Sequence, residues 1–233
     1  MNPLLPLTLV PLLLPDWLDP EYLLTSLGNW ALWGAAFIVF IECAIFPVLP
    51  GDSLLFAVGM FIANDAEIIH FGNLDKPAVL AISILVLVTA AVLGNVVGYW
   101  VGKTISPWLF KPRPGVIGRI FSARHLTQTH LFFERYGSKA LVLGRFVPFV
   151  RTFVTMVAGA AGMSFRTFIT WTGIGAVIWA AGVTLLGFFL GRIEFIKANI
   201  DAVLVVIVLV SVVPMVIEAW LHRRRAAAEV TEP

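Results

Sequence analysis

The amino-acid sequence predicts an all-α, polytopic membrane protein. Of its 233 residues, 59% are hydrophobic and only 13% are charged, and the mean hydropathy is +0.93. Several apolar runs reach the ~20 residues that a helix needs to cross a bilayer, and two of them are interrupted near the middle by proline. The pattern predicts two inverted repeats, each a re-entrant helical hairpin followed by a spanning helix, and a further C-terminal transmembrane helix.

The composition also limits the functional class. A single cysteine, Cys43, excludes an internal disulfide and a multi-cysteine metal site. No histidine lies within a predicted span and no cluster of metal ligands is apparent, so we expect no metal, no cofactor and no enzymatic activity. The basic residues adjoin the spans rather than forming a separate domain, and nucleic acid is therefore not an expected partner.

The N-terminal segment, residues 1–29, is apolar but has four prolines within its first 15 residues. It lacks the basic start of a signal peptide and is short for a span. We expect it to lie at the membrane surface, with insertion as the alternative.

The first interrupted run covers residues 30–63. It is long enough to cross the bilayer, but proline removes a backbone donor and clashes with the preceding turn, so one straight helix is not expected. The sequence favours a re-entrant hairpin of two half-helices, which is tolerated at membrane depth only when it is buried in protein or lines a wet cavity. The expected turn residues are Pro47, Pro50 and Gly51.

Two uninterrupted spans are predicted over residues 78–102 and 165–191. The first ends in glycines at every fourth position, and this spacing lets another helix approach closely. These glycines are Gly94, Gly98 and Gly102. A last span is predicted over residues 202–220.

Charge between the spans predicts the topology. Residues 103–139 hold seven basic residues and one acidic residue, which the positive-inside rule places in the cytoplasm. The tail, residues 221–233, contains the run HRRR and is expected on the same side.

The second interrupted run, residues 140–163, carries Arg145 and Arg151 in otherwise apolar surroundings, with Pro148 between them as the expected turn. A buried, unpaired guanidinium is costly in hydrocarbon, so each arginine should face a polar cavity or a carboxylate. The candidate carboxylates are Glu42 and Asp52 of the first interrupted run. We therefore expect the two runs to meet. Structural salt bridges that only hold the hairpins together are the alternative interpretation.

Four stretches carry a family resemblance. They are FIECAIFPVLPGDSLLFAVG (40–59), GNVVGYWVGK (94–103), THLFFERYG (129–137) and GRFVPFVRTFVTMVAGAAGMSFRTF (144–168). In residues 30–191 the chain resembles the DedA family of bacterial inner-membrane proteins, relatives of eukaryotic proteins with a VTT domain. The asparagine that the family often has near 171–173 is replaced here by WTG, and no role is assigned to that position.

The resemblance implies a multi-pass protein of the bacterial inner membrane that transports lipid with the help of the proton gradient. Flipping of undecaprenyl phosphate or scrambling of phospholipids is the implied activity. Arg145 and Arg151 are the implied ligands of the lipid phosphate, and Glu42 and Asp52 the implied proton-coupling groups. Membrane lipids and protons are thus the expected partners, and association with further copies of the chain is left open.

A mechanism follows from these residue types. Two arginines can clamp a phosphate, and ionised carboxylates would compete with it for them. Protonation of the carboxylates would free the arginines. The alternatives are a proton-coupled small-ion antiporter, in which the acids bind the cation, and a membrane assembly or scaffold protein.

Overall fold

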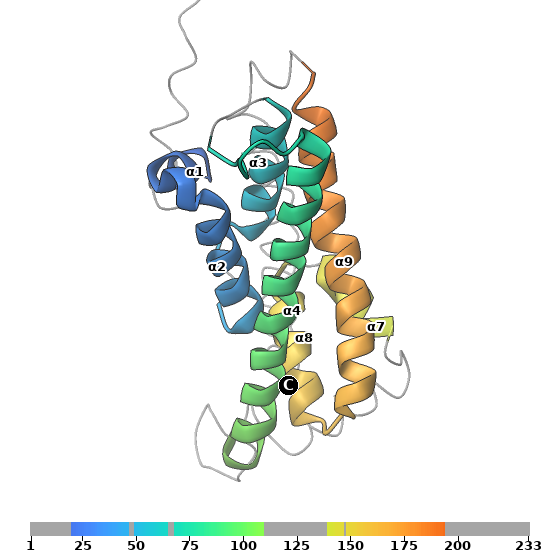
Figure 1. Ribbon diagram of the computed structural model, residues 1–233. Helices are drawn as coiled ribbons and strands as arrows, with labels where there is room; N and C mark the ends of the chain where they lie inside the picture. The colour runs from blue at the N-terminus through green and yellow to red at the C-terminus, as the bar shows by residue number, and fades with distance from the viewer. Residues whose placement is uncertain (1–19, 47–48, 65–67, 110–138, 147, 194–233) are drawn as a thin grey trace, which may run out of the picture.

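The computed structural model describes residues 20–46, 49–64, 68–109, 139–146 and 148–193, and within these ranges the chain is helical and contains no strand. The helices form one elongated bundle (Figure 1). They are α1 (Pro20–Leu27), η3 (Gly28–Trp30), α2 (Ala31–Ala44), α3 (Gly51–Ala63), α4 (Lys76–Leu109), α7 (Lys139–Leu143), η4 (Gly144–Phe146), α8 (Pro148–Ala160) and α9 (Phe165–Leu190).

The helices α4 and α9 run the length of the bundle. The pair α2 and α3 lies beside one half of it, and α8 lies beside the other half (Figure 1). The closest packing joins α3 to α9, α8 to α4 and α2 to α4. The helices α2, α3 and α8 are therefore each held against a long one.

Both interrupted runs are broken where proline was expected to break them. At the end of α2, the N–H groups of Ile45 and Phe46 both donate to the carbonyl of Ile41, at 3.0 and 3.2 Å, and the helix stops. Pro50 is the N-cap residue of α3 and Pro148 is the first residue of α8, positions that proline favours because its missing N–H is not needed there.

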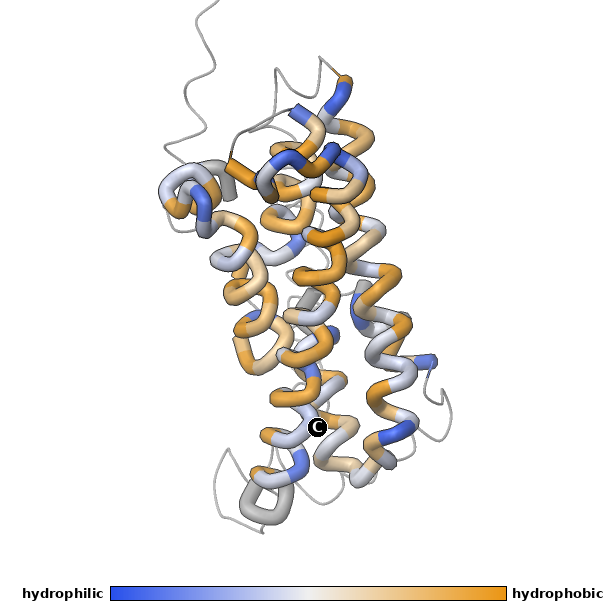
Figure 2. The backbone as a smooth tube through the Cα atoms, in the orientation of Figure 1, coloured by the Kyte–Doolittle hydropathy of each residue, from blue (hydrophilic) through white to orange (hydrophobic). Residues whose placement is uncertain are grey.

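Three helical segments are long and apolar enough to cross a membrane: Tyr22–Ala44, Lys76–Ile105 and Phe165–Leu190. Hydrophobic residues recur along these helices, and the most hydrophilic ones lie mainly toward the helix ends (Figure 2). Large side chains such as Trp30, Phe37 and Leu85 are exposed on the outside of the bundle. An apolar exterior of this kind suits a protein whose solvent is lipid.

The element bounds differ from the predicted ones in two places. Helices α1 and η3 lead directly into α2, so the described helical stretch begins at Pro20 rather than at residue 30. Helix α4 starts at Lys76 and extends to Leu109, beyond the predicted span of 78–102, and it continues through Pro107. Residues 1–19, 110–138 and 194–233, which include the predicted last span and cytoplasmic tail, lie outside the described residues.

Glycines bring α3 against α9. A Cβ on Gly59 would collide with the carbonyl oxygen of Thr184, and a Cβ on Gly187 would collide with that of Phe56. Backbone therefore packs on backbone at this seam, which larger residues would force apart.

Glycines bring α8 against α4 in the same manner. A Cβ on Gly102 would collide with the carbonyl oxygen of Met156, and a Cβ on Gly159 with that of Tyr99. Gly98 lies one turn before Gly102, and a Cβ there would stand 2.7 Å from Oγ1 of Thr155. The glycine spacing in the first predicted span thus does mark a close helix contact.

Candidate functional site

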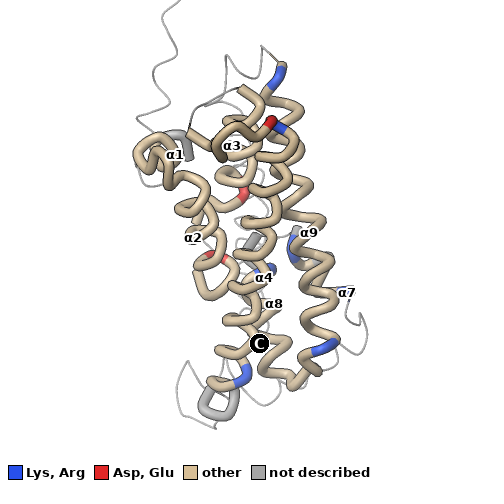
Figure 3. Tube along the Cα trace, viewed as in Figure 1, with Lys and Arg blue, Asp and Glu red and all other residues tan. Residues whose placement is uncertain are grey.

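Charged residues are few between the two ends of the bundle (Figure 3). Four of them are the acids and arginines singled out from the sequence: Glu42 on α2, Asp52 on α3, Arg145 on η4 and Arg151 on α8. Glu42 and both arginines are buried, and the Asp52 side chain is 20% exposed. The site therefore lies inside the bundle.

Arg151 joins the two interrupted runs. Its Nη1 donates to Oδ1 of Asp52 at 2.9 Å, and its Nη2 donates to Oε1 of Glu42. One guanidinium thus binds two carboxylates that are ten residues apart in the sequence and on different helices. The predicted meeting of the arginine run with the acidic run is present in the structure.

The break between α2 and α3 places both acids. Glu42 lies in the last turn of α2, and Asp52 lies in the first turn of α3, where the helix dipole favours a negative charge. Gly51 is the first residue of α3, and Oε2 of Glu42 occupies the space that a Cβ on this residue would need. A glycine is therefore required here for the carboxylate to approach the start of the helix.

Helix α8 also supplies a hydrogen-bond donor to the C-terminal end of α2. Oγ1 of Thr152 donates to the backbone carbonyl of Glu42 at 2.9 Å, and Oγ1 of Thr155 donates to the carbonyl of Thr152 at 2.7 Å. The last carbonyls of a helix have no partner within it, so a buried helix end needs donors from elsewhere. Arg151 and Thr152 together fix the α2 end through one side-chain and one backbone contact.

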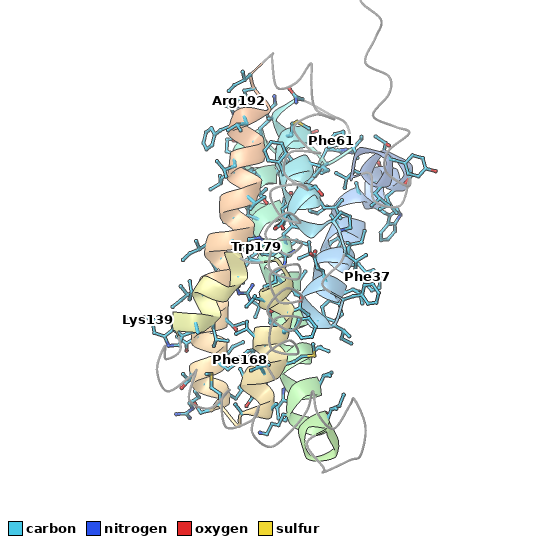
Figure 4. The ribbon with its side chains drawn as sticks, turned by 180° about the vertical axis from the view of Figure 1, so that it is seen from behind. Phe37, Phe61, Lys139, Phe168, Trp179 and Arg192 are labelled. Carbon is cyan, nitrogen blue, oxygen red and sulfur yellow. The ribbon has the colours of Figure 1, made fainter. Side chains whose placement is uncertain are left out.

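Trp179 is a member of the site that sequence reasoning missed. Its indole Nε1 donates to Oδ1 of Asp52 at 2.7 Å, and its ring lies 4.6 Å from Cζ of Arg151. Figure 4 shows it about half-way along the bundle, on α9. One signal was available: tryptophan in membrane helices favours the interface, whereas residue 179 is near the middle of its span.

Arg145 has different surroundings. It is 2% exposed, yet among the residues that the structure describes its Nε, Nη1 and Nη2 have no hydrogen-bond partner. Its stem passes over α9 at Gly175, where a Cβ would stand 2.7 Å from Cδ of the arginine. Thr172, one turn earlier on α9, is buried, and its Oγ1 likewise has no partner within the described part of the chain. A buried cation without a counter-charge is costly, and this arrangement is suited to an anion.

The two arginines are thus not equivalent. Arg151 is bound by two acids and an aromatic ring, whereas Arg145 is bound by none of the site's acids. Of the predicted turn residues, Pro50, Gly51 and Pro148 lie at helix starts, and Pro47 lies outside the described residues. Within the described ranges, no group of three His, Cys, Asp or Glu side chains could hold a metal ion.

The sequence matches a known protein family and several known membrane proteins. The VTT domain family model matches residues 49–189. An uncharacterized membrane protein of Mycobacterium tuberculosis is 39% identical over 225 residues, with 94% of each chain covered. Protein DedA of Escherichia coli is 35% identical over 88% of this chain and 89% of its own length.

The inner membrane protein YqjA of Escherichia coli is 32% identical over 77% of this chain and 76% of its own length. No solved structure gives a significant match. The family model covers more than half of the chain and the relatives cover most of it. The chain therefore belongs to the DedA family of VTT-domain membrane proteins.

Proposed function

We propose that this protein is an inner-membrane transporter that moves a phosphate-bearing lipid across the bilayer with the help of protons. Undecaprenyl phosphate is the favoured lipid and a glycerophospholipid the second choice. The single observation that carries the proposal is the inequality of the arginines: one is bound by two carboxylates, and the other is buried with no hydrogen-bond partner among the residues that the structure describes. A phosphate group is the natural partner for the second, because guanidinium binds phosphate through paired, charge-assisted hydrogen bonds.

The carboxylates set the availability of Arg151. While Glu42 and Asp52 are ionised they bind Arg151, and the lipid phosphate meets Arg145 alone. When the carboxylates take up protons their attraction for Arg151 falls, and its guanidinium can turn to the phosphate beside Arg145. Release of the protons restores the first arrangement and expels the phosphate by competition. Proton uptake and lipid movement are coupled through one side chain.

The arrangement of helices supports entry of lipid from both faces. We infer that α2 with α3, and α7 with α8, are re-entrant hairpins of two inverted repeats, whose breaks meet near the membrane midplane. The starts of α3 and α8 then direct backbone N–H groups toward an anion at the site. The basic segment 103–139 and the C-terminal tail are cytoplasmic in this topology.

A proton-coupled small-ion antiporter is the second candidate. Glu42 and Asp52 meet at one guanidinium, and without it they would form a pair of carboxylates able to hold a cation. Arg145 opposes this function, because a buried positive charge in the same site repels a cation. The lipid phosphate is therefore preferred.

A reconstituted flipping assay tests the proposal. Proteoliposomes with an imposed pH gradient are loaded with undecaprenyl phosphate or with phosphatidylethanolamine, and movement to the opposite leaflet is followed. We expect the wild type to accelerate movement of a phosphate lipid and Arg145→Gln to abolish it. The matched control is Arg166→Gln, because this arginine is exposed on the same bundle.

Two outcomes would contradict the proposal. If Arg145→Gln flips lipid at the wild-type rate, Arg145 does not bind the transported phosphate and the proposal fails. Gradient-driven sodium or potassium flux without lipid movement supports the antiporter instead.

A further inference from the structure

Oδ1 of Asp52 receives hydrogen bonds from two helices. Nη1 of Arg151 on α8 donates to it at 2.9 Å, and Nε1 of Trp179 on α9 donates to it at 2.7 Å. The Trp179 ring also lies 4.6 Å from the guanidinium carbon of Arg151, within the range of a cation–π contact. A single buried side chain, 4% exposed, therefore contacts both members of the ion pair.

We propose that Trp179 is a positioning residue that keeps Asp52 and Arg151 in place while their ion pair opens and closes. The inference rests on the proposed function, in which Arg151 must leave Asp52 to reach a phosphate. At that moment Asp52 would lose a buried hydrogen-bond partner, which is costly. The indole N–H remains bound to Asp52, and the ring face remains beside the departing guanidinium.

A packing role alone explains less. A buried indole needs one acceptor for its N–H, and most side-chain hydrogen bonds in proteins go to backbone or water. Here the acceptor is the same carboxylate oxygen that receives Arg151. The contact therefore acts on the ion pair itself rather than only filling space between α9 and α3.

Other charged residues lie near the ion pair or on the helices beside it. Glu42 on α2 and Arg151 on α8 contact one another, and Arg145 on η4 lies within electrostatic range of Arg151. Helix α4 carries two charged residues: Lys76 is its first residue, and Lys103 lies six residues before its end. Lys76 binds the carbonyl of Ala63 at the far end of α3. Helix α9 thus reaches Asp52 through a neutral donor that keeps its hydrogen when protons move.

The test uses Trp179→Phe, which keeps a ring for Arg151 but removes the N–H. The matched control is Trp171→Phe on the same helix, since Trp171 is partly buried in a separate cluster with Tyr99 and Phe168. The measured quantity is the ratio of lipid flux with a pH gradient to flux without one. We expect the ratio to fall toward one in Trp179→Phe, as in Asp52→Asn, and to stay at the wild-type value in Trp171→Phe.

The ratio separates positioning from structural support. Loss of folded protein lowers both fluxes equally and leaves their ratio unchanged, and a Trp179→Phe variant with that behaviour overturns the inference. The double variant with Asp52→Asn should show no further fall, because the N–H acts through that carboxylate. A further fall would mean that Trp179 acts elsewhere, which also overturns it.

A second readout needs no transport. Cys43 is the chain's single cysteine, follows Glu42 directly and is 1% exposed, so its reaction with N-ethylmaleimide reports opening of the site. We expect labelling of Cys43 to be about tenfold faster in Trp179→Phe, as suits the loss of one hydrogen bond to a charged group. Trp171→Phe should label at the wild-type rate.

This second readout also separates the two proposals. If even the wild type moves no lipid, the proposed function fails, but the labelling rate of Cys43 still tests whether Trp179 keeps the site closed. Labelling that is faster in Trp179→Phe but not in Trp171→Phe supports the inference. Labelling at the wild-type rate overturns the inference whatever the lipid assay gives.

Discussion

Replacing each arginine of the site by methionine should affect stability in opposite ways. Arg151→Met leaves the Glu42 and Asp52 carboxylates close together without their shared cation. Breaking a buried pair by removing one partner costs about 3–5 kcal/mol, and loss of the contact with the Trp179 ring adds about 1 kcal/mol. We therefore expect Arg151→Met to lower the free energy of unfolding by roughly 4–6 kcal/mol, a large part of the total for most domains.

Arg145→Met should not destabilise the protein. Methionine retains most of the apolar stem that packs on Gly175, and it removes a guanidinium whose three nitrogens have no partner among the described residues. Replacing a poorly compensated buried charge by an apolar side chain of similar volume is often neutral or stabilising by about 1–4 kcal/mol. Both variants should nevertheless lose lipid transport, so stability and function separate at Arg145 and fall together at Arg151.

The assay is thermal or denaturant unfolding of the purified protein in detergent, beside lipid flux at matched protein amounts. Arg166→Met provides the control, because an exposed arginine should change stability by no more than about 0.5 kcal/mol. Equal destabilisation of Arg145→Met and Arg151→Met would refute the reasoning, since it would mean that the folded protein compensates both cations alike.

Three further substitutions test individual contacts. Gly51→Ala brings a Cβ onto Oε2 of Glu42, so lipid flux should fall steeply with a loss of about 1–3 kcal/mol in unfolding free energy. Thr152→Val removes the donor to the Glu42 carbonyl and should cost about 1–3 kcal/mol in the same unfolding measurement. Gly159→Ala places a Cβ on the carbonyl oxygen of Tyr99 and should lower the melting temperature by separating α8 from α4.

Two glycines on α9 serve as controls for these substitutions. A Cβ on Gly173 or on Gly182 would meet nothing within 4 Å. Alanine in a helix interior is more stable than glycine by about 0.5–1 kcal/mol, so both alanine variants should melt no lower than the wild type. Melting of Gly173→Ala as low as that of Gly159→Ala would contradict the importance of the close helix contacts.

The sequence contains enough information for the main elements and for the meeting of the charged runs. Proline is unfavourable in a helix interior and tolerated in the first turn, so a division between α2 and α3 near Pro50 could be expected from local chemistry. A lone arginine in an apolar run needs a counter-charge, and few acids were available, so the contact of Arg151 with Glu42 and Asp52 could be expected.

The division of roles between the arginines could not be predicted. Arg145 and Arg151 both lie in a mainly apolar run of the sequence, and only packing decides which one reaches the acids. Trp179 is one of eight tryptophans, and its contact with Asp52 depends on how α9 lies against α3. Long-range packing of this kind is not recorded in residue spacing along one helix.

The start of the first helical stretch could not be predicted from local sequence patterns either. Residues 20–30 contain polar and aromatic side chains in a mixture that fits either a surface segment or a helix. Leu24 of α1 is fully buried in the core that α2, α3, α4 and α9 share, and this burial favours the helix.

Binding of a short-chain polyprenyl phosphate to the purified protein tests the central claim most directly. Titration calorimetry would compare the wild type with Arg145→Gln, and the parent alcohol would show whether the phosphate is required. The account predicts that the wild type binds the phosphate but not the alcohol. It also predicts that Arg145→Gln binds roughly 10–150-fold more weakly, from the ~1.5–3 kcal/mol of a hydrogen bond to a charged group. Equal affinity of the two proteins for the phosphate would contradict it.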